Sequence, residues 1–227
     1  MEGVRRVSCS DRVALARETT RFVSDALASH PGRFVALAVG ESTLPLYDRL
    51  SDVGSGWAGR AIMPVDELVP PPADPDRRFS ARLEAALPDD LRPRLVPLDV
   101  AEDPGLRAIE LDARLRVEGV AAVVLGLGPD GHFAFNQPPT PFDAPTRVVD
   151  LAPANLARLG PGERASSALT LGVKTVMAAG SVLVVASGPG KVDALNHLLS
   201  GPEEADWPVT WLRRHPRLTV AVAADLF

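Results

Sequence analysis

Short runs of aliphatic residues alternate with segments of helical periodicity along most of the chain. The clearest aliphatic runs are residues 34–39, 61–65 and 120–125, and each ends at a turn that contains glycine or acidic residues. This alternation is typical of a parallel β-sheet that helices cover on both faces. The pattern therefore predicts an α/β fold with a mainly parallel central sheet flanked by helices.

Capping and turn residues set the expected limits of the remaining elements. Asp11 is predicted to cap a first helix that runs to about His30, where Pro31 and Gly32 stop it. Residues 70–75 are rich in proline and are predicted to form an irregular loop. Further strands are predicted at residues 95–98, 167–171, 181–186 and 218–222. Further helices are predicted through Tyr47 and Leu50 and at residues 78–87, 105–118, 173–179, 191–199 and 209–213.

Length and composition are those of an ordinary globular chain. With 227 residues the chain is long enough for one large α/β domain, and no repeat or linker divides it, so we predict a single domain over residues 1–227. Hydrophobic residues make up 46% and charged residues 23%, which excludes a disordered chain. The longest apolar run, residues 120–127, is far shorter than the roughly 20 residues that span a bilayer, so no membrane partner is expected.

Charge and cysteine content limit the kinds of binding partner and the cellular compartment that the sequence is compatible with. The net charge is −5 and basic residues form no stripe, so nucleic acid is not expected as a partner. The single cysteine, Cys9, excludes an internal disulfide and a cysteine-rich metal site, and no apolar leader follows Met1. Both observations favour the cytoplasm. The oligomeric state stays open between a monomer and a homo-oligomer.

Four of the predicted strands end in turns that carry glycine or acidic residues. These turns follow residues 39, 65, 125 and 186. Ligands of open parallel sheets bind at the carboxyl ends of the strands, so the four turns are expected to meet at one binding edge. Strand-to-helix turns also require glycine for backbone reasons alone, which is the competing explanation.

The first of these turns has the composition of an anion site. Gly40, Ser42 and Thr43 lie between a strand and a helix, where backbone N–H groups and hydroxyls suit a phosphate. The competing explanation is a capped helix start, because serine and threonine are preferred caps. Glu41 opposes an anion unless its side chain points away.

Asp66 and Glu67 follow the predicted strand at residues 61–65. A carboxylate in a pocket at a sheet edge can act as a general base when burial or its neighbours raise its pKa. A solvated acidic turn, or a carboxylate that caps the next segment, explains the same spacing equally well.

Asp130 and His132 lie two residues apart, with Gly131 between them, directly after a buried strand. A carboxylate beside an imidazole fixes its tautomer and keeps it basic. The other histidines show no metal-ligand spacing, so no metal site is predicted. A structural turn, in which Asp130 bonds the backbone and His132 packs, is the alternative.

Lys191 follows a fourth glycine-rich turn, at the start of a predicted helix. Only two of the 24 basic residues are lysines. A cation at a helix N-terminus opposes the helix dipole, so this lysine is unfavourable unless it meets an anion. Anion binding is slightly favoured over a solvated surface lysine.

Residues 126–138, with the sequence Gly-Leu-Gly-Pro-Asp-Gly-His-Phe-Ala-Phe-Asn-Gln-Pro, resemble the signature of glucosamine-6-phosphate deaminases. The first seven of them also resemble the related 6-phosphogluconolactonases. Residues 40–43, 66–67, 168–173 and 188–191 agree in order and spacing, and residues 207–216 resemble the deaminase tail segment. The resemblance extends from about Phe34 to Ala224 and implies a three-layer Rossmann-like domain.

The resemblance implies conversion of glucosamine 6-phosphate to fructose 6-phosphate and ammonia, with no metal or nucleotide cofactor. It implies that Asp66 moves the proton between C2 and C1 of the sugar. It also implies that His132, oriented by Asp130, assists opening of the pyranose ring.

The same resemblance assigns the phosphate group of a small phosphorylated sugar to residues 40–43 and to Lys191. The family also uses an arginine from a mobile lid, for which Arg158 and Arg164 are both candidates.

Three positions depart from the deaminase pattern. Gln137 replaces a glutamate; we place it among the catalytic candidates, because its amide can hydrogen-bond His132 although it supplies no charge. Glu41 replaces a glycine of the phosphate loop, and Leu68 replaces a tyrosine. These departures keep two alternatives open: a sugar lactonase or non-deaminating isomerase, and a sugar-phosphate sensor without turnover. For the family's substrate, Gln137→Glu is expected to raise ring-opening activity.

Overall fold

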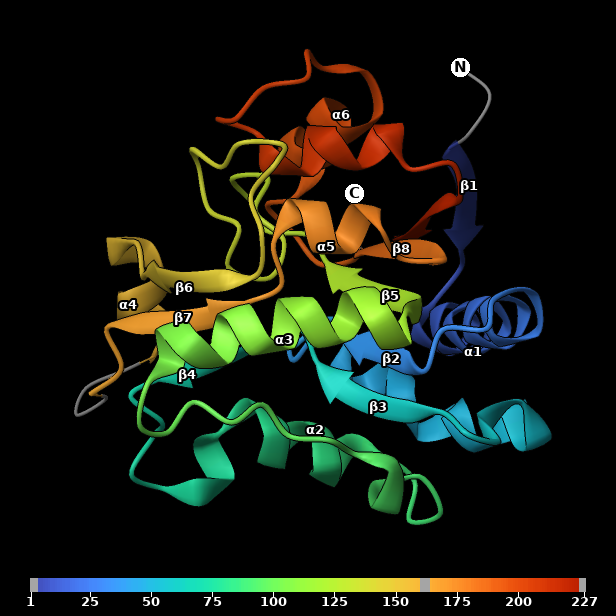
Figure 1. The fold of residues 1–227 in the computed structure, drawn as a ribbon. Helices are drawn as coiled ribbons and strands as arrows, with labels where there is room; N and C mark the ends of the chain where they lie inside the picture. The colour runs from blue at the N-terminus through green and yellow to red at the C-terminus, as the bar shows by residue number, and fades with distance from the viewer. Residues whose placement is uncertain (1–3, 160–163, 225–227) are drawn as a thin grey trace.

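A six-stranded parallel sheet forms the centre of the computed structural model, which describes residues 4–159 and 164–224 (Figure 1). Every pair of neighbouring strands in it is parallel, in the order β1-β9-β8-β5-β2-β3. The fold prediction of a mainly parallel central sheet is therefore confirmed. The strands are β1 (Val4–Cys9), β2 (Phe34–Leu37), β3 (Ala61–Pro64), β5 (Val120–Gly126), β8 (Ser181–Ala186) and β9 (Leu218–Ala223).

Helices cover both faces of this sheet, as Figure 1 shows for α1 and α3, and make it the middle of three layers. Along β8 the side chains alternate: Val182 and Val184 join one hydrophobic cluster, and Leu183 joins the other. Strands that are buried on both faces are continuous apolar runs, which is why the sequence revealed them. One face packs on α1 (Arg12–Ser29), η1 (Leu44–Trp57) and α2 (Phe79–Ala86), and the other on α3 (Pro104–Glu118), α5 (Val173–Met177), α6 (Val192–Ser200) and η4 (Pro208–Arg214).

Side-chain caps fix the starts of the two long helices. The Asp11 carboxylate accepts a hydrogen bond of 2.8 Å from the N–H of Ala14, which confirms the predicted cap of α1. Asp103 does the same for α3 by accepting from Leu106 at 3.0 Å. Such caps satisfy N–H groups that have no partner within the helix.

A second sheet was not expected from the sequence. Three short antiparallel strands, in the order β4-β7-β6, lie beside the central sheet at the left of Figure 1. Residues 167–171 were predicted as a strand, but residues 66–69 and 147–150 were not, because four-residue polar strands give no periodic signal. The elements of this region are β4 (Asp66–Val69), β6 (Arg147–Asp150), β7 (Ser167–Thr170) and the helix α4 (Pro153–Leu159).

The strand predicted at residues 95–98 is wrong. Only Leu95 forms an isolated bridge, with Ile62 of the edge strand β3, and the N–H of Val96 donates to the carbonyl of Ile62 at 2.8 Å. Pro97 has no N–H to extend a ladder, so pairing stops there. The sequence analysis also missed β1. Two short 3-10 turns, η2 (Pro75–Arg77) and η3 (Arg92–Arg94), complete the elements of this part of the chain.

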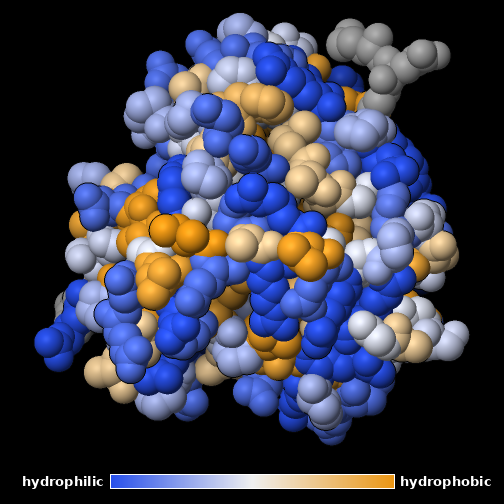
Figure 2. All heavy atoms as spheres, viewed as in Figure 1, coloured by the Kyte–Doolittle hydropathy of each residue, from blue (hydrophilic) through white to orange (hydrophobic). Residues whose placement is uncertain are grey.

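Hydrophilic residues dominate the face of the molecule drawn in Figure 2, and hydrophobic residues appear on it only in small groups. Helix α3 contributes exposed Leu106, Ile109 and Val117 to the surface. Within residues 4–159 and 164–224, no helix has the length and apolar character needed to cross a membrane.

Candidate active site

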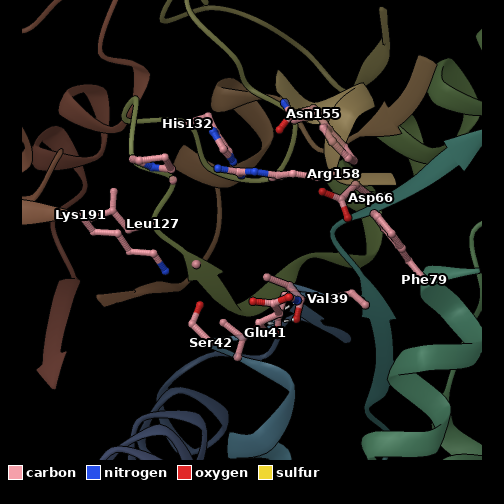
Figure 3. Close-up of a pocket in the computed structure, with 18 of the residues that line it drawn as sticks. Val39, Glu41, Ser42, Asp66, Phe79, Leu127, His132, Asn155, Arg158 and Lys191 are labelled. Atoms are coloured by element: carbon pink, nitrogen blue, oxygen red, sulfur yellow. Dashed lines mark hydrogen bonds between the residues drawn. The ribbon is translucent and has the colours of Figure 1, made fainter. Parts of the chain in front are cut away.

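A cavity of about 800 Å³ opens at the carboxyl ends of the central strands. Residues of all four turns line it, so the prediction that these turns meet at one edge is confirmed. In Figure 3, Asp66 and His132 lie on one side of this cavity with Arg158, and Ser42, Glu41 and Lys191 lie across from them. The lining from the predicted turns comprises Gly40, Glu41, Ser42, Thr43, Asp66, Gly126, Leu127, Gly128, Pro129, His132, Pro189, Gly190 and Lys191.

Asp66 lies where the two sheets meet. It is the first residue of β4, it pairs with Thr170 of β7, and the preceding Val65 donates its N–H to Leu37 of the central sheet. Its side chain is buried, with a residue exposure of 5%. Burial, and secondarily the negative charge of Glu67, raise the pKa of the Asp66 carboxyl to about 8. A carboxyl with such a pKa exchanges protons readily near neutral pH.

Glu67 has a different role from its neighbour. Its carboxylate accepts from the N–H of Phe79 at 2.9 Å and from the N–H and hydroxyl of Ser80 at 2.9 Å each. These groups form the start of α2. Of the two alternatives for the acidic pair, capping of the next segment therefore describes Glu67, while Asp66 faces the cavity.

The turn after β5 presents His132 to the cavity. The Nδ1 atom of His132 lies 2.5 Å from the carboxylate of Asp130, and the backbone closes the turn by a 2.8 Å bond from Gly128 to the His132 carbonyl. Partial burial opposes ionisation of Asp130, but the hydrogen bond and charge of His132 lower its pKa. With Asp130 holding Nδ1, the Nε2 atom is the ring nitrogen left to act on a ligand.

Two glycines of this turn are required by its tight packing. A Cβ atom on Gly128 would lie 2.3 Å from the His132 ring. Gly131 has a φ of +77°, and a Cβ there would lie 2.7 Å from the ring of Trp207. A larger residue at Gly128 would displace the imidazole, and one at Gly131 would displace Trp207 and strain the backbone.

The first turn uses one of its hydroxyls internally. Thr43 is fully buried, and its Oγ1 donates to the Ala38 carbonyl at 2.8 Å and accepts from the Gly40 N–H at 3.1 Å. Thr43 therefore shapes the loop, and Ser42 is the hydroxyl at the cavity surface. Glu41 also lines the cavity, so its negative charge is part of the site.

The three basic residues predicted to bind phosphate differ in whether they line the cavity. Lys191 lines the cavity as the residue before α6, and Arg158 lines it from α4. Figure 3 shows both side chains reaching toward the cavity. Arg164 is exposed and is not part of the lining.

Gln137 does not line the cavity. Its amide bonds the segment that leads into α4, at Asp150, Ala152 and Asn155, and not His132. Gln137 was placed among the catalytic candidates because its amide could hydrogen-bond His132, and the structure does not show that hydrogen bond.

Several lining residues escaped the sequence analysis. Phe79 and Arg82 come from α2, Phe135 stacks on Phe79 with ring centres 6.0 Å apart, and Asn155 comes from α4. Polar and aromatic residues on short helices carry no local signal that distinguishes a cavity from solvent. Among the described residues, no group of three or more histidine, cysteine, aspartate or glutamate side chains could hold a metal ion.

The sequence matches a family model described as glucosamine-6-phosphate isomerases/6-phosphogluconolactonase over residues 12–220. A glucosamine-6-phosphate deaminase of Beutenbergia cavernae is 32% identical over 98% of this chain and 90% of its own length. One from Exiguobacterium sibiricum is 31% identical over 92% of this chain and 86% of its own.

Solved structures share the fold. A monomeric glucosamine-6-phosphate deaminase superposes with a TM-score of 0.86 at 22% identity, covering 97% of this chain and 98% of its own. A 6-phosphogluconolactonase of Thermotoga maritima gives 0.76 at 18% identity, covering 97% and 99%. The family-model match and the two full-length relatives establish that the chain belongs to the family of glucosamine-6-phosphate isomerases and 6-phosphogluconolactonases.

Proposed function

We propose that the protein is a glucosamine-6-phosphate deaminase, which converts glucosamine 6-phosphate and water to fructose 6-phosphate and ammonia. The observation that supports this most is one cavity shared by a buried carboxyl with a raised pKa, Asp66, and an imidazole oriented by Asp130. The names of the relatives that are 31–32% identical over nearly the full chain support the same activity.

The first step is opening of the pyranose ring. It requires a proton to leave the C1 hydroxyl and a proton to reach the ring oxygen, which gives the open-chain aldehyde. His132 carries this transfer through Nε2, because Nδ1 is held at 2.5 Å by Asp130. The carboxylate also stabilises the imidazolium formed on the way.

The second step moves a proton from C2 to C1. Asp66 as a carboxylate removes the C2 proton, which the neighbouring aldehyde makes acidic, and then donates it to C1 of the enol. Its pKa near 8 suits both directions, because a shuttle works best when its pKa lies near the working pH. The product carries an imine at C2, and addition of water there releases ammonia and leaves the ketone of fructose 6-phosphate.

The phosphate lies in this proposal against the loop of residues 40–43, with Lys191 and Arg158 as its cations. Ser42 supplies the hydroxyl, since that of Thr43 is used within the loop. Glu41 belongs to the same loop and lines the cavity, so the proposal requires its carboxylate to point away from the phosphate.

Ammonia release by the purified protein on millimolar glucosamine 6-phosphate tests the proposal. We expect turnover in the wild type and at least a 1,000-fold loss in Asp66→Asn, which keeps the shape and removes the base. Absence of ammonia from the wild type, across the hexosamine 6-phosphates, contradicts deamination.

Lactone hydrolysis is the second candidate. Gln137 replaces the glutamate of the deaminase pattern and its amide bonds the start of α4 instead of His132, whereas the Asp130–His132 pair, which can activate a water molecule, is in place. It predicts acid production from 6-phosphogluconolactone above the spontaneous rate. A rate equal to the spontaneous one removes this candidate.

A further inference from the structure

The side chain of Gln137 makes three hydrogen bonds to one short stretch of chain. Its Oε1 accepts from the N–H of Ala152 at 2.7 Å and from the side-chain amide of Asn155 at 2.6 Å. Its Nε2 donates to the carbonyl of Asp150 at 2.9 Å. Both ends of the amide are therefore used between the end of β6 and the first turn of α4.

This arrangement is a capping interaction supplied from a distant loop. Ala152 precedes α4 (Pro153–Leu159), and its N–H has no partner within the helix. In a capping box a Glu or Gln of the helix itself bonds that N–H. Here Gln137 bonds it from the loop that carries His132.

Helix α4 needs such an anchor. It has seven residues, which is too short for a helix to be stable by itself. Asn155, Arg158 and Leu159, spaced by three and four residues, lie on one face of α4 and line the cavity. A bond that fixes Asn155 therefore also sets the direction in which Arg158 points.

We infer that Gln137 is a positioning residue, which holds α4 so that Arg158 faces the phosphate of the substrate. This inference rests on the proposed sugar-phosphate function of the cavity. It gives Gln137 no part in proton transfer, and it leads to the opposite expectation for Gln137→Glu from the one drawn from the sequence. An ionised glutamate would place an oxygen against the Asp150 carbonyl, where the amide now donates.

Binding measurements separate this role from catalysis. Titration calorimetry with fructose 6-phosphate is performed on the wild type, Gln137→Met, Arg158→Ala and the double variant. We expect each single variant to weaken binding about 10-fold, and the double variant to be no weaker than Arg158→Ala. Multiplied effects in the double variant, or unchanged binding by Gln137→Met, overturn the inference.

Hydrogen exchange and kinetics add two readouts. In Gln137→Met the backbone amide of Ala152 should exchange about 10-fold faster, whereas Ser167→Ala, which removes a 3.1 Å bond to the Asp150 side chain, should leave binding unchanged. Gln137→Glu should weaken binding at pH 8, where the ionised carboxylate places an oxygen against the Asp150 carbonyl in place of the donating amide. A loss of kcat in Gln137→Met with unaltered KM overturns the inference in favour of a catalytic Gln137.

The two proposals fail separately. Absence of ammonia release contradicts the deaminase proposal and leaves the binding and exchange results to decide the role of Gln137. Ammonia release by the wild type, together with independent effects of Gln137 and Arg158 on binding, supports the deaminase proposal and contradicts the positioning role of Gln137.

Discussion

At the scale of residues, the two adjacent carboxyl groups of Asp66 and Glu67 have different roles because their surroundings differ. Asp66 is buried at the cavity with a raised pKa, and Glu67 accepts four hydrogen bonds, three of them at the start of α2. Adjacent strand residues point to opposite sides, which is how neighbours in sequence reach different partners. Because burial disfavours the ionised form of Asp66, the free energy of unfolding of the protein should depend on pH.

Asp66→Asn should stabilise the protein at alkaline pH. The folded pKa of Asp66, about 8, exceeds the ordinary value of 3.8, so the stability that its protonated form contributes is fully present below about pH 4 and is lost as pH rises through 8. The variant does not ionise. We expect its free energy of unfolding to exceed that of the wild type by several kcal/mol more at pH 9 than at pH 5. Denaturant unfolding at both pH values measures this, and an equal difference at both refutes the raised pKa.

The rate should also follow the ionisation of Asp66. Only the carboxylate removes the C2 proton, so kcat/KM on glucosamine 6-phosphate should fall about 10-fold per pH unit below the pKa near 8. Initial rates of ammonia release between pH 5 and 9 give the inflection. An inflection near pH 4 would mean that Asp66 is not the base or is not desolvated.

At the scale of elements, short helices at the site depend on side chains from elsewhere. Glu67 of β4 caps α2, and Gln137 bonds the start of α4. Both helices bring lining residues to the cavity, Arg82 and Arg158 among them. Their placement is therefore coupled to the strands and loops that carry the acidic and imidazole groups.

Glu67→Gln should weaken the protein and shift its pH profile. One oxygen that accepts from Ser80 becomes a donor, and we expect a loss of about 2 kcal/mol in the free energy of unfolding. Loss of the Glu67 charge should lower the pKa of Asp66 and move the inflection in kcat/KM to lower pH. As the matched control, Ser80→Ala removes one bond at about 1 kcal/mol and keeps the charge, so its inflection should stay. A shift in the control variant would contradict this explanation.

At the scale of the whole molecule, the cavity joins segments from all parts of the chain. The two sheets meet beside Asp66. The cavity is lined by residues 38–43, 66, 79, 82, 126–129, 132, 134–135, 155, 158–159 and 189–191. A ligand that contacts these segments together should stabilise the entire fold, because only the folded chain assembles them.

Fructose 6-phosphate at about 100 times its Kd should raise the free energy of unfolding by about 2.7 kcal/mol. This corresponds to a rise of about 5–10 °C in Tm for a chain of this size. Differential scanning calorimetry measures it, with fructose at the same concentration as control. Equal stabilisation by fructose would show that the phosphate is not what the cavity recognises.

The sequence by itself determined five of the six strands of the central sheet, all but β1, and the edge at which the site lies. Doubly buried strands such as β5 are continuous apolar runs, and the turns after them carry glycine, aspartate and histidine at fixed places. Tertiary structure alone decided the small sheet, the separation of Asp66 from Glu67, the choice of Arg158 over Arg164 for the cavity, and the partners of Gln137. The physical reason is that periodicity records which face of a long element is buried, whereas short polar strands and single hydrogen bonds depend on residues distant in the chain.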